Sequence, residues 1–433
     1  MKNTMHTYVG FGFGAIQPGL LLYEAFRSRA FNRYVVAEIL PELVKAVTDA
    51  DGCYTLNMAG MDGVRQMRLG PVELLDVGKE NHRQKLIEAI AGAHEIGTAI
   101  TTFNQYVMDI PGSLHLMLAE GIIRKTTNDQ PSAVIYCAEN NNHAAELLQE
   151  VVMPEIPANL RDAVQEKVQF VNTVVSKMCG LVTDSEVIQT NHLSLMWRDS
   201  EVKRALLVED YDLLLINRIH LPRYRRGISI FEEKDDLLPF KEAKLFGHNG
   251  THAIAAYIGG FTGLNRITQM RDRPVMMAFL RKAFLEEVGT ALCRKYSGFD
   301  PLFTPGGFSE FVDSILLRMV NPYLLDTVAR VGRDPRRKLG WEDRLVGAIR
   351  LALDFDVKPA RYAFGAAAAL ASMDESIIQK PKSVSESLLT IWHPEDTGVP
   401  PTREEYAVLA EITEGMSRFL SWRDSGYTDS FLW

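Results

Sequence analysis

Residues 9–19 read VGFGFGAIQPG, a glycine-rich turn between an apolar run and a helix-forming segment. The run HTYVGFGFG, at residues 6–14, has the composition of a buried strand, and GLLLYEAFRSR, at residues 19–29, has the period of a helix. In a dinucleotide-binding fold, the turn that leaves such a strand needs glycines, here Gly12 and Gly14. They let the backbone bend tightly and approach a pyrophosphate. The free N–H groups of the following helix attract the phosphates. The stretch therefore predicts a Rossmann-type domain.

This fingerprint has one irregular position and one supporting feature. Gln17 occupies the place of the third glycine, and Gly19 comes two residues late. Glu38 ends the next strand candidate, RYVVAE, where a carboxylate accepts hydrogen bonds from the adenosine ribose and repels a 2′-phosphate. The glycines alone are compatible with a turn that binds nothing, whereas together with Glu38 they favour NAD as the cofactor. The predicted cofactor-binding residues are Gly12, Gly14, Ala15, Ile16 and Glu38.

The rest of the chain divides into two kinds of sequence. Up to about residue 190, strand candidates such as EIGTAIT and SAVIYCAE alternate with helical segments such as HRQKLIEAIAGA, a pattern typical of βαβ units. Beyond it, HAIAAYIGGFTG, DRLVGAIRLALDF and EEYAVLAEITEGMSRFLSW are helical in period. We therefore expect an α/β Rossmann-type domain with a mostly parallel sheet over residues 1–190. An all-α domain follows over residues 191–433, with residues 201–232 ambiguous and compatible with an extension of the sheet.

The bulk composition excludes several classes of protein. A net charge of −8 over 433 residues repels nucleic acid and anionic membranes, so attraction for an anionic ligand has to be local. No apolar run is long enough to span a bilayer. The cysteines are too widely spaced for a zinc site or a disulfide framework: Cys53, Cys137, Cys179 and Cys293. We expect a cytoplasmic protein without a metal.

Residues 244–252 read KLFGHNGTH and concentrate groups that can handle protons. With Lys244 at zero, an α-helix would place His248 at about 40°, His252 at about 80° and Asn249 at about 140° around its axis. Removal of a hydride from a secondary alcohol needs a base for the hydroxyl proton and donors for the developing alkoxide. A lysine with a lowered pKa can be that base, and the amide and imidazole can hold the oxygen. Composition alone favours an exposed lysine, two satisfied histidines and an Asn-Gly turn.

A resemblance decides between these interpretations. The pattern KLF-x-x-N-x-x-H resembles the Lys, Asn, His signature of the long-chain polyol dehydrogenases, the mannitol dehydrogenase family. The segment RMVNPYLLDTVARVGRDPRRKLGWEDRLVG, at residues 318–347, is similar to the corresponding part of the mannitol-1-phosphate 5-dehydrogenases in that family. FVNTVVSKM and YCAENNNHAAEL have weaker counterparts there. The resemblance covers residues 8 to about 370 and leaves the last sixty or so unmatched.

The resemblance implies roles for individual residues. It makes Lys244 the general acid/base, and it makes Asn249 and His252 the groups that polarise the carbonyl, without a metal. His248 lies in the variable part of the signature and receives no role. The implied substrate-binding residues are Asn140 in the CAEN stretch and a basic pair, Arg330 and Lys338.

Three positions depart from the family pattern. Gln17 replaces a glycine of the fingerprint, and Thr101 stands where relatives tend to have a glycine close to the cofactor. Ser176 stands where relatives carry an aspartate beside the site, which puts strict specificity for mannitol 1-phosphate in doubt. The catalytic trio is intact.

The implied activity is an NAD-dependent oxidation of a polyol phosphate, by default mannitol 1-phosphate to fructose 6-phosphate. Residues 318–347, here called the basic segment, also contain Arg333, Arg336 and Arg337. These three fit a phosphate clamp or a solvated loop equally well. A second hypothesis is a dehydrogenase of an unphosphorylated polyol or a hexuronate. A third is a non-catalytic sensor of NAD or sugar phosphate, against which the intact trio weighs. The family default is a monomer with a small-molecule substrate.

Overall fold

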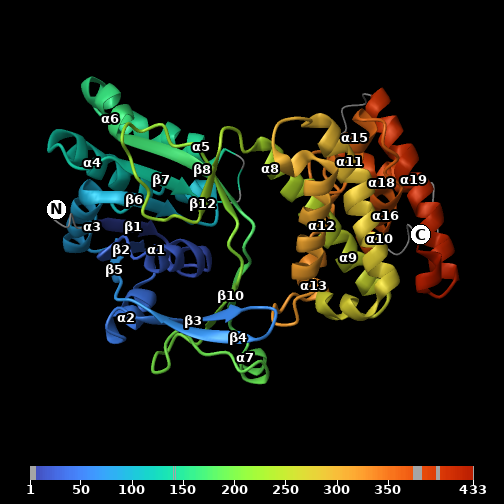
Figure 1. The fold of residues 1–433 in the computed structure, drawn as a ribbon, viewed down its shortest axis with the longest axis horizontal. Coiled ribbons are helices and arrows are strands. Elements are labelled where there is room, and N and C mark those ends of the chain that lie inside the picture. Colours follow the sequence, from blue (N-terminus) through green and yellow to red (C-terminus); the bar gives the residue numbers. More distant parts are fainter. Residues whose placement is uncertain (1–5, 140, 142, 374–382, 396–399, 433) are drawn as a thin grey trace. The chain divides into compact units, whose positions relative to one another are not determined.

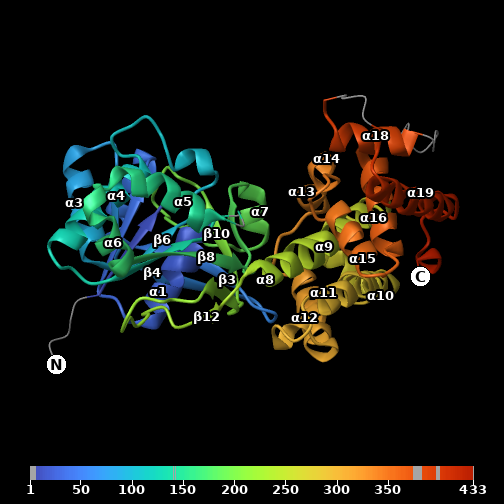
Figure 2. The ribbon, with the colours of Figure 1, turned by 90° about the horizontal axis from the view of Figure 1, so that it is seen from above.

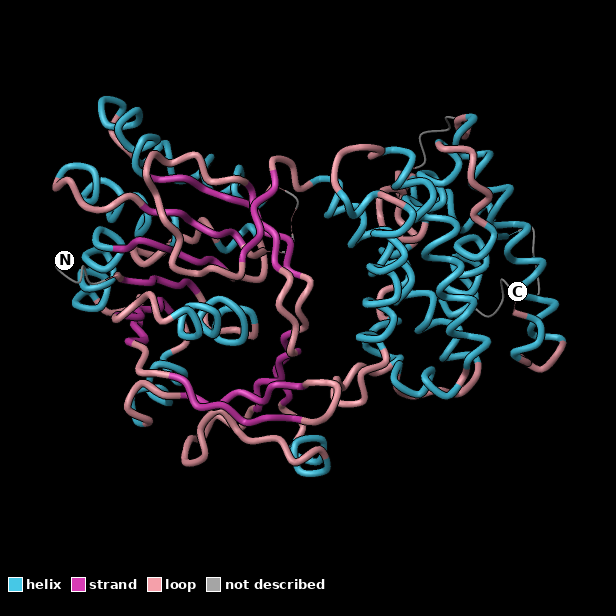
Figure 3. The backbone as a smooth tube through the Cα atoms, viewed as in Figure 1, coloured by secondary structure: helices cyan, strands magenta, loops and turns pink. Residues whose placement is uncertain are grey.

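The computed structural model describes residues 6–139, 141, 143–373, 383–395 and 400–432. Its internal contacts divide the chain into two compact units, Met1–Leu238 and Pro239–Trp433. In Figure 1 the first unit runs from blue to green and the second from yellow to red. The named strands of the described residues all belong to the first unit, as the magenta segments of Figure 3 show.

The first unit is built on an eight-stranded sheet with the order β12-β11-β8-β7-β6-β1-β2-β5. Its strands are β1 (Thr7–Phe11), β2 (Arg33–Glu38), β5 (Glu73–Asp76), β6 (Ala93–Thr98), β7 (Ala133–Cys137), β8 (Val168–Val175), β11 (Leu214–Asn217) and β12 (Phe231–Lys234). All neighbours from β5 to β8 pair in parallel, while β11 pairs antiparallel to β8. The six parallel strands follow the Rossmann order, and the direction of winding reverses between β1 and β6. The predicted α/β fold is confirmed.

Helices cover both faces of this sheet. Apolar side chains of β1, such as Val9 and Phe11, point to the face that α3, α4, α5 and α6 cover. The neighbouring Tyr8 points to the opposite face, against α1, α2 and the smaller sheet. This alternation is the period of two expected of a strand buried on both sides. Figure 2 shows α3–α6 together on one side of the sheet. The helices are α1 (Leu22–Ser28), α2 (Pro41–Asp49), α3 (Glu80–Gly92), α4 (Leu114–Thr127), α5 (Ala144–Val152), α6 (Arg161–Lys167) and α7 (Ser185–Thr190).

A second sheet of four strands completes the first unit, in the order β4-β3-β10-β9. Its strands are β3 (Tyr54–Ala59), β4 (Val64–Leu69), β9 (Cys179–Val182) and β10 (Ala205–Glu209). Because β10, β11 and β12 all pair with strands of this unit, the division falls at Leu238 and not at residue 190, where the sequence predicted it. The ambiguous segment 201–232 therefore contributes strands to the sheets.

The second unit is helical over its described residues, as predicted. The helices are α8 (Leu238–Glu242), α9 (Gly250–Phe261), α10 (Pro274–Lys282), α11 (Thr290–Lys295), α12 (Pro305–Met319), α13 (Val328–Gly332), α14 (Pro335–Lys338), α15 (Val346–Asp354), α16 (Ala360–Met373), α18 (Ser383–Trp392) and α19 (Arg403–Asp424). π-Helical turns join α8 to α9 (Ala243–Asn249) and α10 to α11 (Ala283–Gly289). The alanine-rich α16 is buried on all sides, which explains why it lacks a polar face.

The C-terminal segment belongs to this helical core. α19 packs along α16, with Phe419 and Trp422 fully buried beside Phe364. Its first turn is closed by a capping box between Thr402 and Glu405. None of the helices in the described ranges has both the length and the apolar character needed to cross a membrane.

Candidate active site

The glycine turn after β1 has the geometry that the fingerprint predicts. Gly12 has a φ of 81°, which an L side chain rarely adopts, and its N–H donates to the carbonyl of Ala37 at 2.9 Å. A Cβ built on Gly14 would meet no atom within 4 Å, so the turn has open space on that side. Ala15 and Ile16 are partly buried against the core beneath the turn, and Pro18 lies in the first turn of the helix.

Gln17, the irregular residue of the fingerprint, points into the interior. Its side chain is fully buried, and its Nε2 donates to the hydroxyl of Tyr8 at 2.8 Å. The space it fills exists because residue 10 is a glycine: a Cβ there would lie 2.2 Å from the Gln17 Nε2. The departure is therefore accommodated under the turn and leaves the open side of Gly14 unchanged.

Glu38 holds the glycine turn as well as ending β2. One carboxylate oxygen accepts from the backbone N–H of Phe13 at 2.7 Å. The other accepts from the N–H groups of Ile39 and Leu40 at 2.7 and 3.0 Å. Because a carboxylate offers about four acceptor positions, these three bonds leave capacity for a ribose hydroxyl. Arg204, which sequence reasoning missed, donates to the carbonyl of Phe13 at 3.1 Å and comes from the approach to β10.

A pocket lies where β6 and β7 end, in the same unit. Thr101, Phe103 and Tyr106 line it from the segment after β6, and Glu139 and Asn141 from the segment after β7. Thr101, one of the departures, thus lies on the pocket wall. The predicted Asn140 lies outside the described residues.

Glu139 is a titratable group of this pocket that sequence reasoning missed. Its carboxylate accepts from the hydroxyl of Thr98 at 3.1 Å and from the N–H of Ile100 at 3.2 Å. Burial raises the pKa of Glu139, and the hydrogen bonds that it accepts oppose that effect. The CAEN stretch had drawn attention to its asparagine alone.

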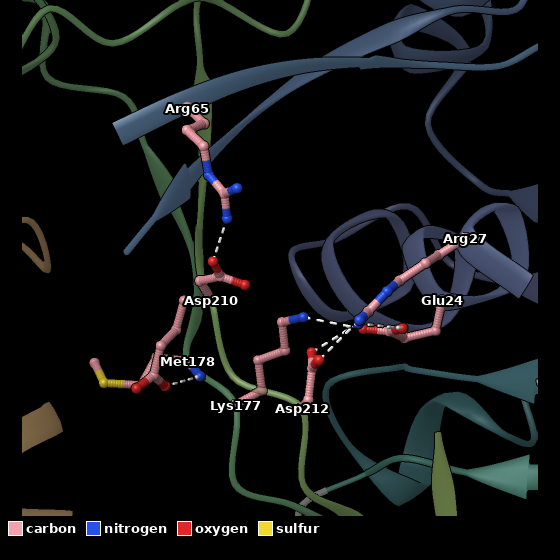
Figure 4. A network of polar contacts seen from close by, with 8 residues as sticks. Glu24, Arg27, Arg65, Lys177, Met178, Asp210 and Asp212 are labelled. Carbon is pink, nitrogen blue, oxygen red and sulfur yellow. Dashed lines mark hydrogen bonds and ion pairs between the residues drawn. The ribbon is translucent and has the colours of Figure 1, made fainter. Parts of the chain in front are cut away.

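Ser176 and Lys177 follow β8, at the third departure from the family pattern. Lys177 is buried and pairs with the equally buried Glu24 of α1, with 3.1 Å between Nζ and Oε1. Arg27, one turn further along α1, forms two hydrogen bonds with Asp212 at 2.8 and 2.9 Å. Figure 4 shows that these pairs tie α1 to the chain after β8 and before β11. The ammonium group of Lys177, next to Ser176, therefore forms an internal ion pair with Glu24.

In the second unit, the segment Ala243–Asn249, which contains KLFGHN, forms a π-helical turn and not the α-helix assumed from sequence. The N–H of Gly250 donates to the carbonyl of Leu245, five residues earlier. A π-turn holds more residues than an α-turn, so Asn249 comes closer to the face of Lys244 than the α-helical estimate allowed. Tyr362 of α16 supports the turn, since its hydroxyl donates to the carbonyl of Phe246 at 2.5 Å. Single-turn π-bulges are frequent at functional sites.

The two glycines of this segment are required by close packing. A Cβ on Gly247 would lie 2.1 Å from the ring of Phe284. A Cβ on Gly250 would lie 2.9 Å from the carbonyl oxygen of Arg344 and 2.9 Å from the ring of Tyr362. Gly250 therefore lets the start of α9 approach the backbone of the basic segment directly.

The two titratable members of the predicted trio, Lys244 and His252, both have lowered pKa values. Burial, with the positive charges of Arg344 and Lys241, lowers the pKa of Lys244 to about 8. Burial and the charges of Arg330, Arg344 and Lys338 lower the pKa of His252 to about 3. Near neutral pH, His252 is therefore a neutral imidazole, while Lys244 exchanges its proton in the working range of an enzyme.

His252 lies next to a carboxylate that sequence reasoning did not identify. Its Nε2 is 3.5 Å from Oδ2 of the buried Asp326, which also pairs with Arg330. The rings of His248 and His252 are stacked with 6.0 Å between centroids, and burial lowers the pKa of His248 well below its usual value. Two histidines four residues apart can share a zinc ion. Among the described residues, however, no three His, Cys, Asp or Glu side chains gather as metal ligands.

The basic segment brings part of its charge to the trio. Lys338 is buried, its Nζ donates to the carbonyl of Arg333, and burial with the charges of Arg344 and Arg337 lowers its pKa to about 8. The three arginines considered for a phosphate clamp, Arg333, Arg336 and Arg337, are exposed. The second unit thus gathers Lys244, His252, Arg330 and Lys338, and the first gathers Gly12, Gly14 and Glu38.

Comparison with known proteins covers both units. Residues 6–218 match the mannitol dehydrogenase Rossmann domain, and residues 236–379 match the mannitol dehydrogenase C-terminal domain. A mannitol-1-phosphate 5-dehydrogenase of Bacillus licheniformis is 30% identical over 83% of this chain and 86% of its own. One of Caldanaerobacter subterraneus is 29% identical over 66% of this chain and 67% of its own.

Solved structures share the fold over nearly the full length. The Pseudomonas fluorescens mannitol 2-dehydrogenase, solved with NAD and D-mannitol, aligns with a TM-score of 0.69 at 16% identity, covering 99% of this chain and 94% of that one. A substrate-free D-sorbitol dehydrogenase aligns with a TM-score of 0.75 at 13% identity, covering 99% and 96%. Both alignments extend beyond residue 379 into the C-terminal helices. With both family models matched and curated relatives along most of its length, the chain belongs to the mannitol dehydrogenase family.

Proposed function

We propose that this protein interconverts a polyol phosphate and its ketose phosphate with NAD, with mannitol 1-phosphate and fructose 6-phosphate as the default pair. The family consists of NAD-dependent oxidoreductases that act on secondary alcohols of polyols, and the curated relatives are named mannitol-1-phosphate 5-dehydrogenases. The observation that carries the proposal is one buried segment that holds both the amine of Lys244, with its pKa lowered to about 8, and a neutral His252, with the charge of Arg344 acting on both.

The first unit has residues suited to NAD. The open side of Gly14 gives the pyrophosphate room, and the helix start after Ala15 and Ile16 offers it N–H groups. Glu38 retains acceptor capacity for the adenosine ribose. When bound, NAD supplies the acceptor for the substrate's hydride.

The trio supports the proton part of the reaction. Lys244, when neutral, takes the proton of the reacting hydroxyl, and in the reverse direction its ammonium returns that proton to the alkoxide. His252 stays neutral and donates one N–H to the oxygen, joined by the amide of Asn249. Because the base is an amine, the step requires no metal. We infer that dialysis against a chelator leaves turnover unchanged, whereas loss of activity that zinc restores would contradict it.

A phosphorylated substrate is supported by the local charge. Arg330, Arg344 and Lys338 all lower the pKa of His252, so three cations act on one imidazole in a protein with a net charge of −8. Such a field favours a dianion over a neutral sugar. Arg330 is partly neutralised by Asp326, and we assign it and Lys338 to the substrate side of the site. All the groups of the trio come from one chain, so a monomer suffices.

A second candidate is an unphosphorylated substrate that carries a carboxylate, a hexuronate. The same cations would bind it, and by the family resemblance Ser176 stands where an aspartate is expected. The test follows NADH consumption by the full chain with fructose 6-phosphate, fructose and a ketouronate in parallel. Turnover of the phosphate with the highest kcat/KM supports the proposal. Turnover of only the other two, or of none, overturns it.

A further inference from the structure

Arg344 is a cation of the second unit that no sequence signature assigned. Its backbone lies against the start of α9, since its carbonyl oxygen is the atom that a Cβ on Gly250 would meet at 2.9 Å. The next residue, Leu345, donates its N–H to the carbonyl of Lys338 at 3.3 Å. The chain thus places Arg344 next to both the residue after Asn249 and the turn that carries Lys338.

The side chain of Arg344 is fixed through its Nε, while its terminal nitrogens Nη1 and Nη2 have no acceptor among the described residues. Oδ1 of Asp343 accepts from its backbone N–H at 2.7 Å and from its Nε at 2.8 Å. The side chain is 16% exposed, and within the described part of the chain no acceptor binds Nη1 or Nη2. A guanidinium anchored through Nε keeps its terminal N–H pair available for a two-pronged contact with an oxyanion.

The charge of Arg344 acts on several groups of the site. It contributes to the lowered pKa values of Lys244, His252 and Lys338. By contrast, Arg336 and Arg337 are exposed and already engaged. Arg336 donates to the carbonyl of Thr390 at 3.1 Å, and Arg337 lies 3.5 Å from the carboxylate of Asp334.

We propose that Arg344 binds the phosphate of the substrate through Nη1 and Nη2 and thereby selects phosphorylated over unphosphorylated polyols. The assignment rests on the proposed function. It has a consequence for the acid/base group: phosphate bound to Arg344 offsets the positive charge that lowers the pKa of Lys244. The pKa of Lys244 is therefore higher in the substrate complex than in the free enzyme.

The test compares the full chain with Arg344→Gln and Arg344→Lys. Loss of a charge-assisted bidentate contact in Arg344→Gln should raise the KM for fructose 6-phosphate roughly 10- to 100-fold. The Kd for NADH, measured by fluorescence titration, should stay unchanged. The same variant should move the inflection of kcat/KM against pH to a higher pH, because Lys244 loses a nearby positive charge. Arg344→Lys keeps the positive charge, so the inflection of kcat/KM should stay at the wild-type pH. It loses the bidentate contact with the phosphate, so the KM for fructose 6-phosphate should still rise.

Arg281→Gln is the matched control, since Arg281 also forms an arginine–aspartate pair, with Asp313 at 2.6 Å, on the exposed side of α10. It should leave the KM for fructose 6-phosphate unchanged. Thermal melting checks that each variant is folded, and Arg344→Lys carries the test if the glutamine variant is not. A KM within twofold of the wild type and an unmoved inflection in both variants would overturn the assignment alone. A wild type that never reduces fructose 6-phosphate would overturn the proposed function first.

Discussion

The pKa of about 8 for Lys244 has opposite consequences for the two directions of the reaction. Oxidation needs the neutral amine, whose fraction grows as the pH rises through the pKa. Reduction needs the ammonium, whose fraction falls over the same range. We therefore expect kcat/KM for polyol phosphate oxidation to rise up to about pH 8 and then level off. The value for ketose phosphate reduction should level off below that pH and fall above it. Initial rates across about one pH unit on either side test this. Profiles of the same slope in both directions would be incompatible with it.

His252 should contribute no inflection of its own near neutrality. Its pKa of about 3 keeps the imidazole neutral throughout the assay range. His252→Ala removes the donor N–H and should lower kcat by roughly 10²- to 10³-fold. His252→Gln keeps a donor N–H and should lower kcat less. Equal losses in both variants would show that the imidazole acts other than as a hydrogen-bond donor.

At the scale of residues, the sequence indicated groups that lie close together along the chain. Lys244, Asn249 and His252 share one short segment, so a helical period was enough to group them. Asp326, Tyr362 and Arg344 come from the chain before α13, from α16 and from the chain before α15, and they meet this segment only through tertiary packing. No local pattern encodes such contacts. Glu139 was overlooked although it lies beside the predicted Asn140, because the motif drew attention to the amide.

At the scale of elements, the π-helical turn before α9 depends on Gly250. Gly250→Ala places a methyl group 2.9 Å from a backbone oxygen, which cannot yield as the end of a side chain can. We expect a lower melting temperature and a lower kcat. Gly260→Ala is the control in the same helix, where the nearest atom is 3.6 Å away. That variant should gain up to about 1 kcal/mol, as alanine normally does over glycine. Equal behaviour of the two variants would contradict the packing argument.

Helix α18, which precedes α19, supports the basic segment through one tryptophan. Trp392 Nε1 donates to the carbonyl of Leu339 at 2.9 Å, next to Lys338, and its ring lies 4.8 Å from that of Trp341. Trp392→Phe removes that hydrogen bond, worth about 0.5–1.5 kcal/mol. We expect the KM for fructose 6-phosphate to rise while the Kd for NADH is unchanged.

Trp422→Phe is the control for this prediction. Trp422 Nε1 also donates to a backbone carbonyl, that of Thr428 at 3.1 Å, but within the last turn of the chain. It should cost more stability than Trp392→Phe, because Trp422 is fully buried and the smaller ring leaves a cavity, yet it should leave the KM for fructose 6-phosphate unchanged. A KM that rises equally in both variants would indicate general loosening of the unit.

The sequence predicted which segments are strands and which are helices. It did not predict the π-helical turns inside the helices. RYVVAE was predicted as a strand and forms β2 (Arg33–Glu38), and DRLVGAIRLALDF was predicted as helical and contains α15 (Val346–Asp354). The π-turns within the helices were missed, because the residues of an i→i+5 turn are those of an ordinary helix. The glycines that permit these turns were visible, but their neighbours Phe284 and Tyr362 were not.

At the scale of the molecule, the first unit depends on the buried pair between Glu24 and Lys177. Lys177→Met leaves the buried Glu24 carboxylate with Arg27 alone, at 3.5 Å from the half-exposed guanidinium, which should cost up to about 3–5 kcal/mol. Burial already raises the pKa of Glu24, so without Lys177 the carboxyl is protonated in the folded state up to a higher pH than in the unfolded state. The loss of stability should therefore grow as the pH rises.

Denaturant melts at several pH values measure this loss. The double variant Glu24→Leu with Lys177→Met should recover much of it, since apolar groups can replace a buried ion pair. Lys45→Met, in the exposed pair with Asp49, should have little effect. A small, pH-independent loss in Lys177→Met would contradict the account.

The two-unit architecture was predictable, but the boundary was not. The change from alternating strands and helices to helices alone lies near residue 190, whereas the first unit extends to Leu238. β10, β11 and β12 are short and joined by irregular segments. Their membership is decided by pairing with β3 and β8, which are distant in sequence.

The amine of Lys244 is the centre of this account, and one single-turnover measurement tests it. Wild type and Lys244→Met, each mixed with NADH and fructose 6-phosphate, are followed by the loss of NADH absorbance, with NADH affinity measured separately. We expect the variant to bind NADH as the wild type does and to transfer hydride about 10²- to 10⁴-fold more slowly. Lys282→Met, on the exposed side of α10, should match the wild type. Hydride transfer at the wild-type rate in Lys244→Met would show that another group moves the proton.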